Sequence, residues 1–218
     1  PLADVPVAGA DAVIGDRAYG TEPAKVAAIG RAVTDGLGAG GVLPVLKHIP
    51  GHGRATADTH FQLPTVDTPA AELDRTDFAA FRPLADLPMA MTAHVVFSAL
   101  DRAQPATTSA TIITEVIRGS IGFQGLLMSD DVSMNALQGT IAERTRASIA
   151  AGCDMILHCN GKPDEMREVA DHTPLLEGIA LERALRALAA RKQPEPFDRE
   201  QGRAELDELV SRGGALTA

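Results

Sequence analysis

The hydrophobic positions of this chain form two patterns that alternate along the sequence. Short apolar runs lie at residues 42–46, 88–93, 125–128 and 154–157, and each is followed by polar residues. Longer stretches with helical spacing fill the gaps between the runs. Because the runs do not alternate apolar with polar residues, they are typical of strands covered on both faces, as in parallel sheets.

The stretches between the runs predict helices. One stripe of apolar side chains extends over residues 22–37, and proline after Thr68 marks a second helix start. A helix capped by Ser109 and another over residues 141–151, closed by Gly152, are expected next. Another helix is expected at residues 181–192. Residues 199–212 are expected to form either a charged surface helix or a frayed tail.

The alternation of strands and helices predicts an α/β fold with a parallel sheet. An open doubly wound sheet and a closed barrel both fit this pattern. The predicted strands end in reactive side chains, namely His48, His94, Asp130 and either His158 or Asn160. Active sites of (β/α) barrels are assembled from the carboxyl ends of several strands, whereas an open sheet usually gathers its site at one crevice. The position of these residues therefore favours a barrel.

Composition narrows the class of protein. The chain has 218 residues, of which 45% are hydrophobic and 22% charged, so we expect a soluble globular protein with one domain or two. A net charge of -9 argues against a nonspecific nucleic-acid partner. No apolar run approaches the roughly 20 residues of a membrane span, and no leader marks secretion. Cys153 and Cys159 are expected to be reduced core thiols in a reducing compartment.

The residues with the clearest chemical potential lie in two segments. Residues 47–60 hold three of the six histidines, and His60 follows Asp58 by two positions. A carboxylate at that spacing in a loop can accept a hydrogen bond from an imidazole, orient the ring and raise its basicity. Asp130 ends a predicted strand and can act as nucleophile, base or metal ligand. Its neighbour Asp131 is expected to hydrogen-bond the backbone of the following turn instead.

Three interpretations of these residues compete. Histidines are often structural, although a cluster beside a strand end makes this less attractive here. A zinc or iron site would use the same His and Asp side chains, but the chain lacks the paired ligand motifs and the glycine-rich loop is poorly suited to hold a metal. In the third interpretation Asp130 attacks a substrate and His60 shuttles a proton. The residues alone leave the last two interpretations open.

Four segments resemble known motifs in their known order. Residues 47–53 (KHIPGHG) followed by 58–60 (DTH) resemble the histidine-loop signature of the glycoside hydrolase family 3 β-N-acetylglucosaminidases. Residues 129–134 (SDDVSM) look like the nucleophile motif of that family. Residues 14–20 (IGDRAYG) and 151–157 (AGCDMIL) are similar to two further segments. The resemblance covers roughly residues 1–190.

The resemblance implies a retaining exo-β-N-acetylglucosaminidase of the cytoplasm. Such enzymes remove non-reducing terminal N-acetylglucosamine from muropeptides during peptidoglycan recycling, and they need no metal or cofactor, which counts against the metal interpretation. The implied partner is a small carbohydrate, with no nucleic acid and no membrane. Carried over by position, the roles are as follows: Asp130 forms the covalent glycosyl-enzyme, His60 is the acid/base with Asp58 as its dyad partner, and Arg17, Lys47 and His48 hold the sugar.

The resemblance also implies a TIM-type barrel of which this chain carries only part. The family barrel has eight strands, and we count about five strand–helix units, the first being the stub at residues 1–5, so the first three strands have no counterpart. We expect a partial catalytic barrel at residues 1–194 and a tail or surface helix at 195–218. We expect such a chain to be a fragment, a partial gene or an unusual half-barrel completed by association. The alternative functions are an inactive, sugar-binding remnant and a phosphorylase that uses phosphate as acceptor.

Overall fold

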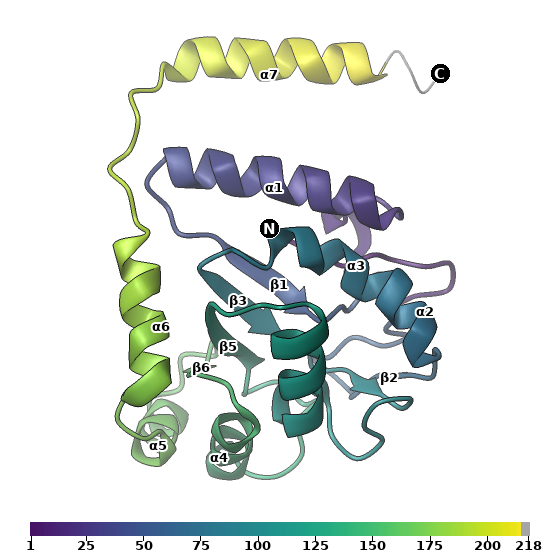
Figure 1. Ribbon diagram of the computed structural model, residues 1–218, viewed down its shortest axis with the longest axis vertical. Helices are drawn as coiled ribbons and strands as arrows, with labels where there is room; N and C mark the ends of the chain where they lie inside the picture. Colours follow the sequence, from purple (N-terminus) through teal and green to yellow (C-terminus); the bar gives the residue numbers. More distant parts are fainter. Residues whose placement is uncertain (215–218) are drawn as a thin grey trace.

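A four-stranded parallel sheet lies at the centre of the computed structural model, which describes residues 1–214 (Figure 1). Its strands follow one another in space as they do in sequence. They are β1 (Val45–Ile49), β3 (Met89–Thr92), β5 (Leu126–Asp131) and β6 (Met155–Leu157). All four strands expected from the apolar runs are therefore present, and the α/β prediction is confirmed.

The predicted strand stub at the N-terminus is reduced to a single parallel bridge. Leu2 pairs with Lys47 on the free side of β1. The N–H of Ala3 donates to the carbonyl of Lys47, and the N–H of Lys47 donates to the carbonyl of Pro1. The N-terminal segment thus occupies a fifth position in the sheet without forming a regular strand.

Two strands end one residue beyond their predicted last residues, His48 and Asp130, whereas β3 ends before His94 and β6 before His158. β1 includes Lys47 and His48, and β5 includes Asp130 and Asp131. Pairing explains the difference, because Ile49 still pairs with Thr92, and Asp131 still pairs with Leu157. The polar residues therefore lie within the ends of the strands, where backbone hydrogen bonds hold their positions.

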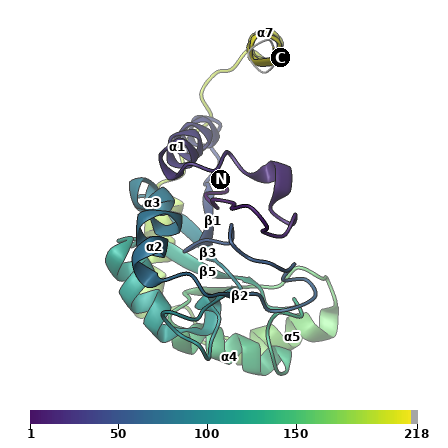
Figure 2. The ribbon, with the colours of Figure 1, turned by 90° about the vertical axis from the view of Figure 1, so that its right-hand side faces the viewer.

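Helices follow an arc around one side of the sheet, and the strands lie inside the arc (Figure 2). The α-helices are α1 (Pro23–Ala39), α2 (Ala70–Arg75), α3 (Asp77–Phe81), α4 (Ile141–Ala151), α5 (Pro163–His172), α6 (Gly178–Ala189) and α7 (Arg199–Gly214). Short helices are η1 (Gly15–Arg17), η2 (Arg82–Leu84) and η3 (Ala106–Thr108), and η4 (Ile112–Ser120) has π-type hydrogen bonding. This arrangement is that of a partial barrel.

The helix ends agree with the chemistry of their capping residues. Thr140 and Glu143 form a reciprocal capping box at the start of α4, and Gly152 closes the helix in the left-handed region, with φ 115°. The hydroxyl of Ser109 accepts a hydrogen bond from the N–H of Ile112. The helix expected at 181–192 begins and ends about three residues earlier, as α6. We did not expect α5, whose apolar stripe is too thin to produce a helical pattern.

The core lies between the sheet and the helices. Its largest fully buried side chains include Phe81, Phe97, Phe123, Leu46 and Leu127. A small parallel sheet of β2 (Thr65–Val66) and β4 (Val96–Phe97) was not expected, because two-residue strands leave no periodic pattern. Through β4 it holds Phe97 edge-to-face against Phe78, with ring centroids 6.1 Å apart.

The expectation of strands covered on both faces is wrong for β6. This strand lies at the end of the sheet (Figure 1). Its residue Met155 is 41% exposed. Among residues 1–214 no strand pairs with the outer side of β6. The side chains of β6 are therefore only partly covered, with α4 packed beside the strand.

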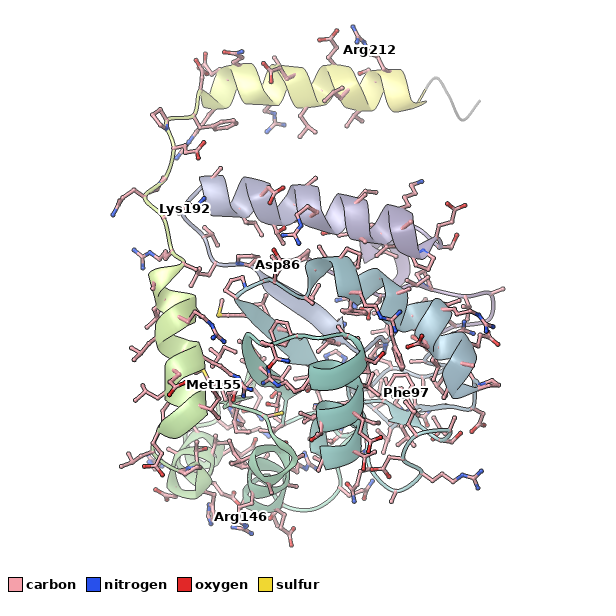
Figure 3. All side chains as sticks on the ribbon, viewed as in Figure 1. Asp86, Phe97, Arg146, Met155, Lys192 and Arg212 are labelled. Carbon is pink, nitrogen blue, oxygen red and sulfur yellow. The ribbon has the colours of Figure 1, made fainter. Side chains whose placement is uncertain are left out.

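The C-terminal segment forms a helix that lies apart from the rest in both views (Figures 1 and 2). The linker around Lys192 joins it to α6 (Figure 3). The alternative of a surface helix is therefore the one observed for 199–212, whereas residues 215–218 lie outside the described part of the chain. The division at residue 194 stays a prediction. No helix within residues 1–214 is both long and apolar enough to cross a membrane.

Candidate active site

A cavity of about 320 Å³ opens at the carboxyl ends of β1 and β5. Five of the six predicted site residues line it, namely Arg17, Lys47, His48, His60 and Asp130. The sixth, Asp58, does not line the cavity, but its carboxylate contacts Nδ1 of His60. The structure thus brings together side chains that are far apart in the sequence.

Asp130 lies at the end of β5 with 7% of its surface exposed. Its N–H donates to the hydroxyl of Thr92 over 3.2 Å, and its Oδ1 accepts from the N–H of Asp131 over 2.8 Å. One carboxylate face therefore remains toward the cavity, in a position that the neighbouring strand β3 fixes.

Asp131 holds the backbone, as expected. Its Oδ1 accepts from the N–H of Ser133 over 2.9 Å and from the N–H of Cys159 over 3.1 Å. Its Oδ2 accepts from the hydroxyl of Ser133 over 2.7 Å. Both acids line the cavity, but both oxygens of Asp131 accept hydrogen bonds that join the end of β6 to the turn after β5.

His60 and Asp58 form a hydrogen-bonded pair on the loop between β1 and β2. Nδ1 of His60 lies 2.7 Å from Oδ1 of Asp58, and the N–H of His60 donates to the same oxygen over 2.9 Å. These two contacts hold the pKa of Asp58 below its ordinary value, the backbone hydrogen bond more than the imidazole. Because an ionised carboxylate only accepts, Nδ1 of His60 carries a proton and Nε2 is left for the cavity.

The loop that carries His60 is exposed but tied down. The side chain of His60 is 59% exposed. Its backbone carbonyl accepts from the amide of Asn135 over 3.0 Å, and the carbonyl of Thr59 accepts from the N–H of Ala136 over 3.2 Å. Both donors follow Asp130 closely in sequence, so the turn after β5 supports the loop of the proposed acid/base.

Two of the predicted strand-end residues do not reach the cavity. His94 is fully buried, with Nδ1 2.7 Å from the hydroxyl of Thr107 and Nε2 3.0 Å from the carbonyl of Asp131. Burial lowers its pKa, so it acts as a neutral support beneath β5. His158 turns away, with Nε2 3.0 Å from Glu165 on α5.

The two cysteines differ from each other. Cys153 is buried in the core as expected, and burial raises its pKa to about 12. The expectation is wrong for Cys159, which is exposed and lines the cavity, because the chain turns outward after β6. Both are free thiols. Within residues 1–214 no three His, Cys, Asp or Glu side chains are grouped to hold a metal ion.

Around the Lys47–His48 strand, sequence reasoning missed Asp4 and counted His52 within the histidine cluster without giving it a role. Asp4 is fully buried and hydrogen-bonds both His48 and His52. His52 lines the cavity, and burial lowers its pKa despite the attraction of Asp4. The available signal was a single acidic residue within the apolar stub Leu2–Val5, since an unpaired buried carboxylate would be costly.

Comparisons with known proteins identify the family of this chain. Residues 1–188 match the glycosyl hydrolase family 3 N terminal domain. A β-hexosaminidase of Chromobacterium violaceum is 43% identical over 158 residues, which are 71% of this chain and 44% of that protein. The chain spans about half the length of the curated relatives it matches.

Solved structures show the same likeness in three dimensions. NagZ of Neisseria gonorrhoeae in complex with N-trifluoroacetyl-D-glucosamine is 34% identical, with a TM-score of 0.77 over 94% of this chain and 58% of that one. Zinc-bound CbsA of Thermotoga neapolitana is 32% identical, also with a TM-score of 0.77, over 89% of this chain and 45% of that one. The partial TIM-type α/β fold is therefore confirmed, and the chain belongs to glycosyl hydrolase family 3, whose N-terminal domain it matches.

Proposed function

We propose that this chain carries the catalytic centre of a retaining β-N-acetylglucosaminidase. The observation that carries the proposal is the placement of His60, paired with Asp58, on the same cavity as the strand-end carboxylate of Asp130. The names of the relatives support the reaction class, because they are β-hexosaminidases. NagZ, bound to an N-acylated glucosamine, supports the kind of sugar.

In the first step, an oxygen of Asp130 bonds to the anomeric carbon of the sugar as the bond to the leaving oxygen breaks. His60, protonated on both nitrogens, gives the proton on Nε2 to that oxygen. The ionised Asp58 stabilises the imidazolium, and imidazole is the side chain best suited to exchange a proton near neutral pH. The products are the free alcohol and a glycosyl ester on Asp130.

In the second step, water attacks the anomeric carbon and the ester oxygen of Asp130 leaves. Nε2 of His60 takes the proton from the water, which restores the starting state. The usual pair of carboxylates in retaining enzymes is thus replaced by one carboxylate and one imidazole. This replacement leaves one negative charge fewer near Asp130, so the nucleophile is not repelled by a second catalytic carboxylate.

The proposed natural substrate is a muropeptide fragment with terminal N-acetylglucosamine, cleaved in the cytoplasm during peptidoglycan recycling. The support is the similarity of motifs together with the two cationic side chains at the cavity, Arg17 and Lys47. Both can donate to sugar hydroxyls, and they favour an anionic muramyl-peptide leaving group electrostatically.

The experiment is release of aryl alcohol from an aryl N-acetyl-β-D-glucosaminide. Asp130→Asn should abolish turnover and the covalent intermediate seen by mass spectrometry after denaturing quench. His60→Ala should slow poor leaving groups far more than activated ones, because only poor ones need a proton. His172→Ala, on the distant helix α5, is the matched control and should leave both rates unchanged. Equal losses on both substrate types would contradict the acid role of His60.

A second candidate is favoured by the open edge of β6 with its exposed Met155. In this alternative the cavity binds the sugar but turns it over only when a further strand covers that edge. Saturable binding of N-acetylglucosamine without turnover in wild type would support it.

Adding inorganic phosphate to the assay separates phosphorolysis from hydrolysis, since only a phosphorylase would release the sugar 1-phosphate.

A further inference from the structure

Asp4 is the one residue of the N-terminal stub, residues 1–5, that has an ionisable side chain, and it is fully buried beneath the cavity. It accepts three hydrogen bonds from one short segment. The N–H of His52 donates over 2.7 Å, the N–H of His48 over 3.3 Å, and Nδ1 of His48 lies 2.7 Å from Oδ2. A buried carboxylate with this many donors is ionised and firmly held.

The charge state of Asp4 agrees with these contacts. Burial by itself would raise its pKa, but the attraction of His48 and the hydrogen bonds from His48 and His52 outweigh burial, and the pKa lies below its ordinary value. An ionised carboxylate has no proton to give. Nδ1 of His48 must therefore be the donor, and a neutral His48 has its proton on Nδ1 and a lone pair on Nε2.

The free nitrogen of His48 faces the cavity. The imidazole lines the cavity, and its side chain is 9% exposed. Among residues 1–214, Nε2 has no hydrogen-bond partner and is not one of the polar atoms sealed from solvent. His52 differs, because its Nδ1 is sealed and unpartnered. Of these two imidazoles, only that of His48 has a nitrogen, Nε2, that the structure leaves available to a ligand in the cavity.

We propose that Asp4 is a positioning residue that fixes His48 as the Nδ1–H tautomer, so that Nε2 offers the bound sugar a hydrogen-bond acceptor. Lys47, its neighbour at the cavity, can only donate. Together they match a hydroxyl group, which gives its proton to Nε2 of His48 and accepts from the ammonium of Lys47. The part concerning the sugar rests on the proposed function, whereas the tautomer does not.

The test uses Asp4→Asn, which reverses the tautomer while keeping the shape. The amide oxygen can still accept from the N–H groups of His48 and His52, and the amide nitrogen then donates to Nδ1 of His48. Nε2 must carry the proton and becomes a donor. Asp35→Asn, an exposed position on α1, removes the same charge elsewhere and is the matched control.

Long-range ¹H–¹⁵N correlation spectra of the imidazoles report the tautomer directly. His48→Gln identifies the His48 signals by their loss. At about pH 8 wild type and Asp35→Asn should show the Nδ1–H form and Asp4→Asn the Nε2–H form. Should Asp4→Asn fail to fold, the wild-type spectrum alone decides, because an Nε2–H or doubly protonated His48 would overturn the assignment.

Kinetics separate positioning from folding. Asp4→Asn should raise the KM for an aryl N-acetyl-β-D-glucosaminide at least about tenfold. In the variant the Nε2–H of His48 would face the proton of the sugar hydroxyl, so two donors would meet without an acceptor. A merely structural loss would lower kcat through fewer active molecules and leave KM unchanged, which would overturn the role proposed for the sugar. If wild type does not turn over, the proposed function fails, and the tautomer and the Kd for N-acetylglucosamine still test Asp4.

Discussion

Replacing Gly53 by alanine should destabilise the protein because two backbone segments meet there. A Cβ atom on Gly53 would lie 2.1 Å from the carbonyl oxygen of Val5, 2.3 Å from its carbonyl carbon and 2.7 Å from the nitrogen of Pro6. All three neighbours are backbone atoms, so no side chain can rotate away to make room. The histidine loop and the N-terminal segment must separate for the methyl group to fit.

The size of the effect follows from the contacts that this separation would break. The two backbones must part by about 1.3 Å to restore an ordinary contact of 3.4 Å. Val7 N–H donates to the carbonyl of Gly53 over 3.2 Å, and the N–H of the preceding residue, His52, donates to Asp4 over 2.7 Å. Each bond contributes roughly 0.5–1.5 kcal/mol net, and more when a charge is involved. We therefore expect a loss of about 2–4 kcal/mol in the free energy of unfolding.

Equilibrium unfolding in urea measures this loss, and Gly36→Ala is its control. Gly36 lies exposed within α1, and nothing lies within 4 Å of its added Cβ. Alanine there should stabilise the protein by about 0.5–1 kcal/mol, because glycine is a poor helix former. The same substitution should thus have opposite signs at the two sites. A loss below about 1 kcal/mol for Gly53→Ala would refute the close packing of the loop on the N-terminal segment.

Three further predictions concern other parts of the molecule. Asn135→Ala removes the amide that holds the loop of the proposed acid/base, so kcat on poor leaving groups should fall about tenfold, and an unchanged rate would show that the loop needs no such tie. Hydrogen bonds, of which that from His158 has the largest effect, lower the pKa of Glu165 from 4.5 to about 2. The contribution of Glu165 to the free energy of unfolding is therefore complete above pH 4.5 and is lost as the pH falls toward 2. The urea stabilities of wild type and Glu165→Gln should therefore differ at about pH 7, differ less at about pH 3 and converge only as the pH falls to about 2. In the folded protein maleimide should label Cys159 but spare the buried Cys153, and mass spectrometry that finds two labels would contradict the burial.

The fold was accessible from the sequence where local signals agree with the tertiary structure. The run at residues 125–128 is followed by Asp130 because a buried parallel strand needs apolar side chains on both faces and ends at the carboxyl edge of the sheet. Gly152 marks the end of α4 because it adopts a left-handed conformation that other residues avoid. The strand at Met155 looks the same in sequence, yet it lies at the edge, since burial depends on neighbours that a local pattern does not contain.

The site was predictable only in part, for a similar reason. The pairing of His60 with Asp58 depends on residues two positions apart, so the sequence shows it. The hydrogen bond from the Asn135 amide to the carbonyl of His60 joins residues 75 positions apart, and no local pattern in either segment predicts it. Asp4 contacts His48 across 44 positions in the same way. Contacts of this kind arise from the order of strands in the sheet.

The conformation of the histidine loop, residues 48–60, is therefore fixed by contacts with two other segments of the chain as well as by its own sequence. On one side Asp4 and the backbone of Val5 hold the segment from His48 to Gly53. On the other side the turn after Asp130 holds the backbone of residues 59–60. Because its support is split, a change on the N-terminal side should alter how sugar binds to His48, and a change in the turn should alter proton transfer by His60. The KM effect expected for Asp4→Asn and the kcat effect expected for Asn135→Ala follow from this division, and a double variant should combine both effects without added coupling.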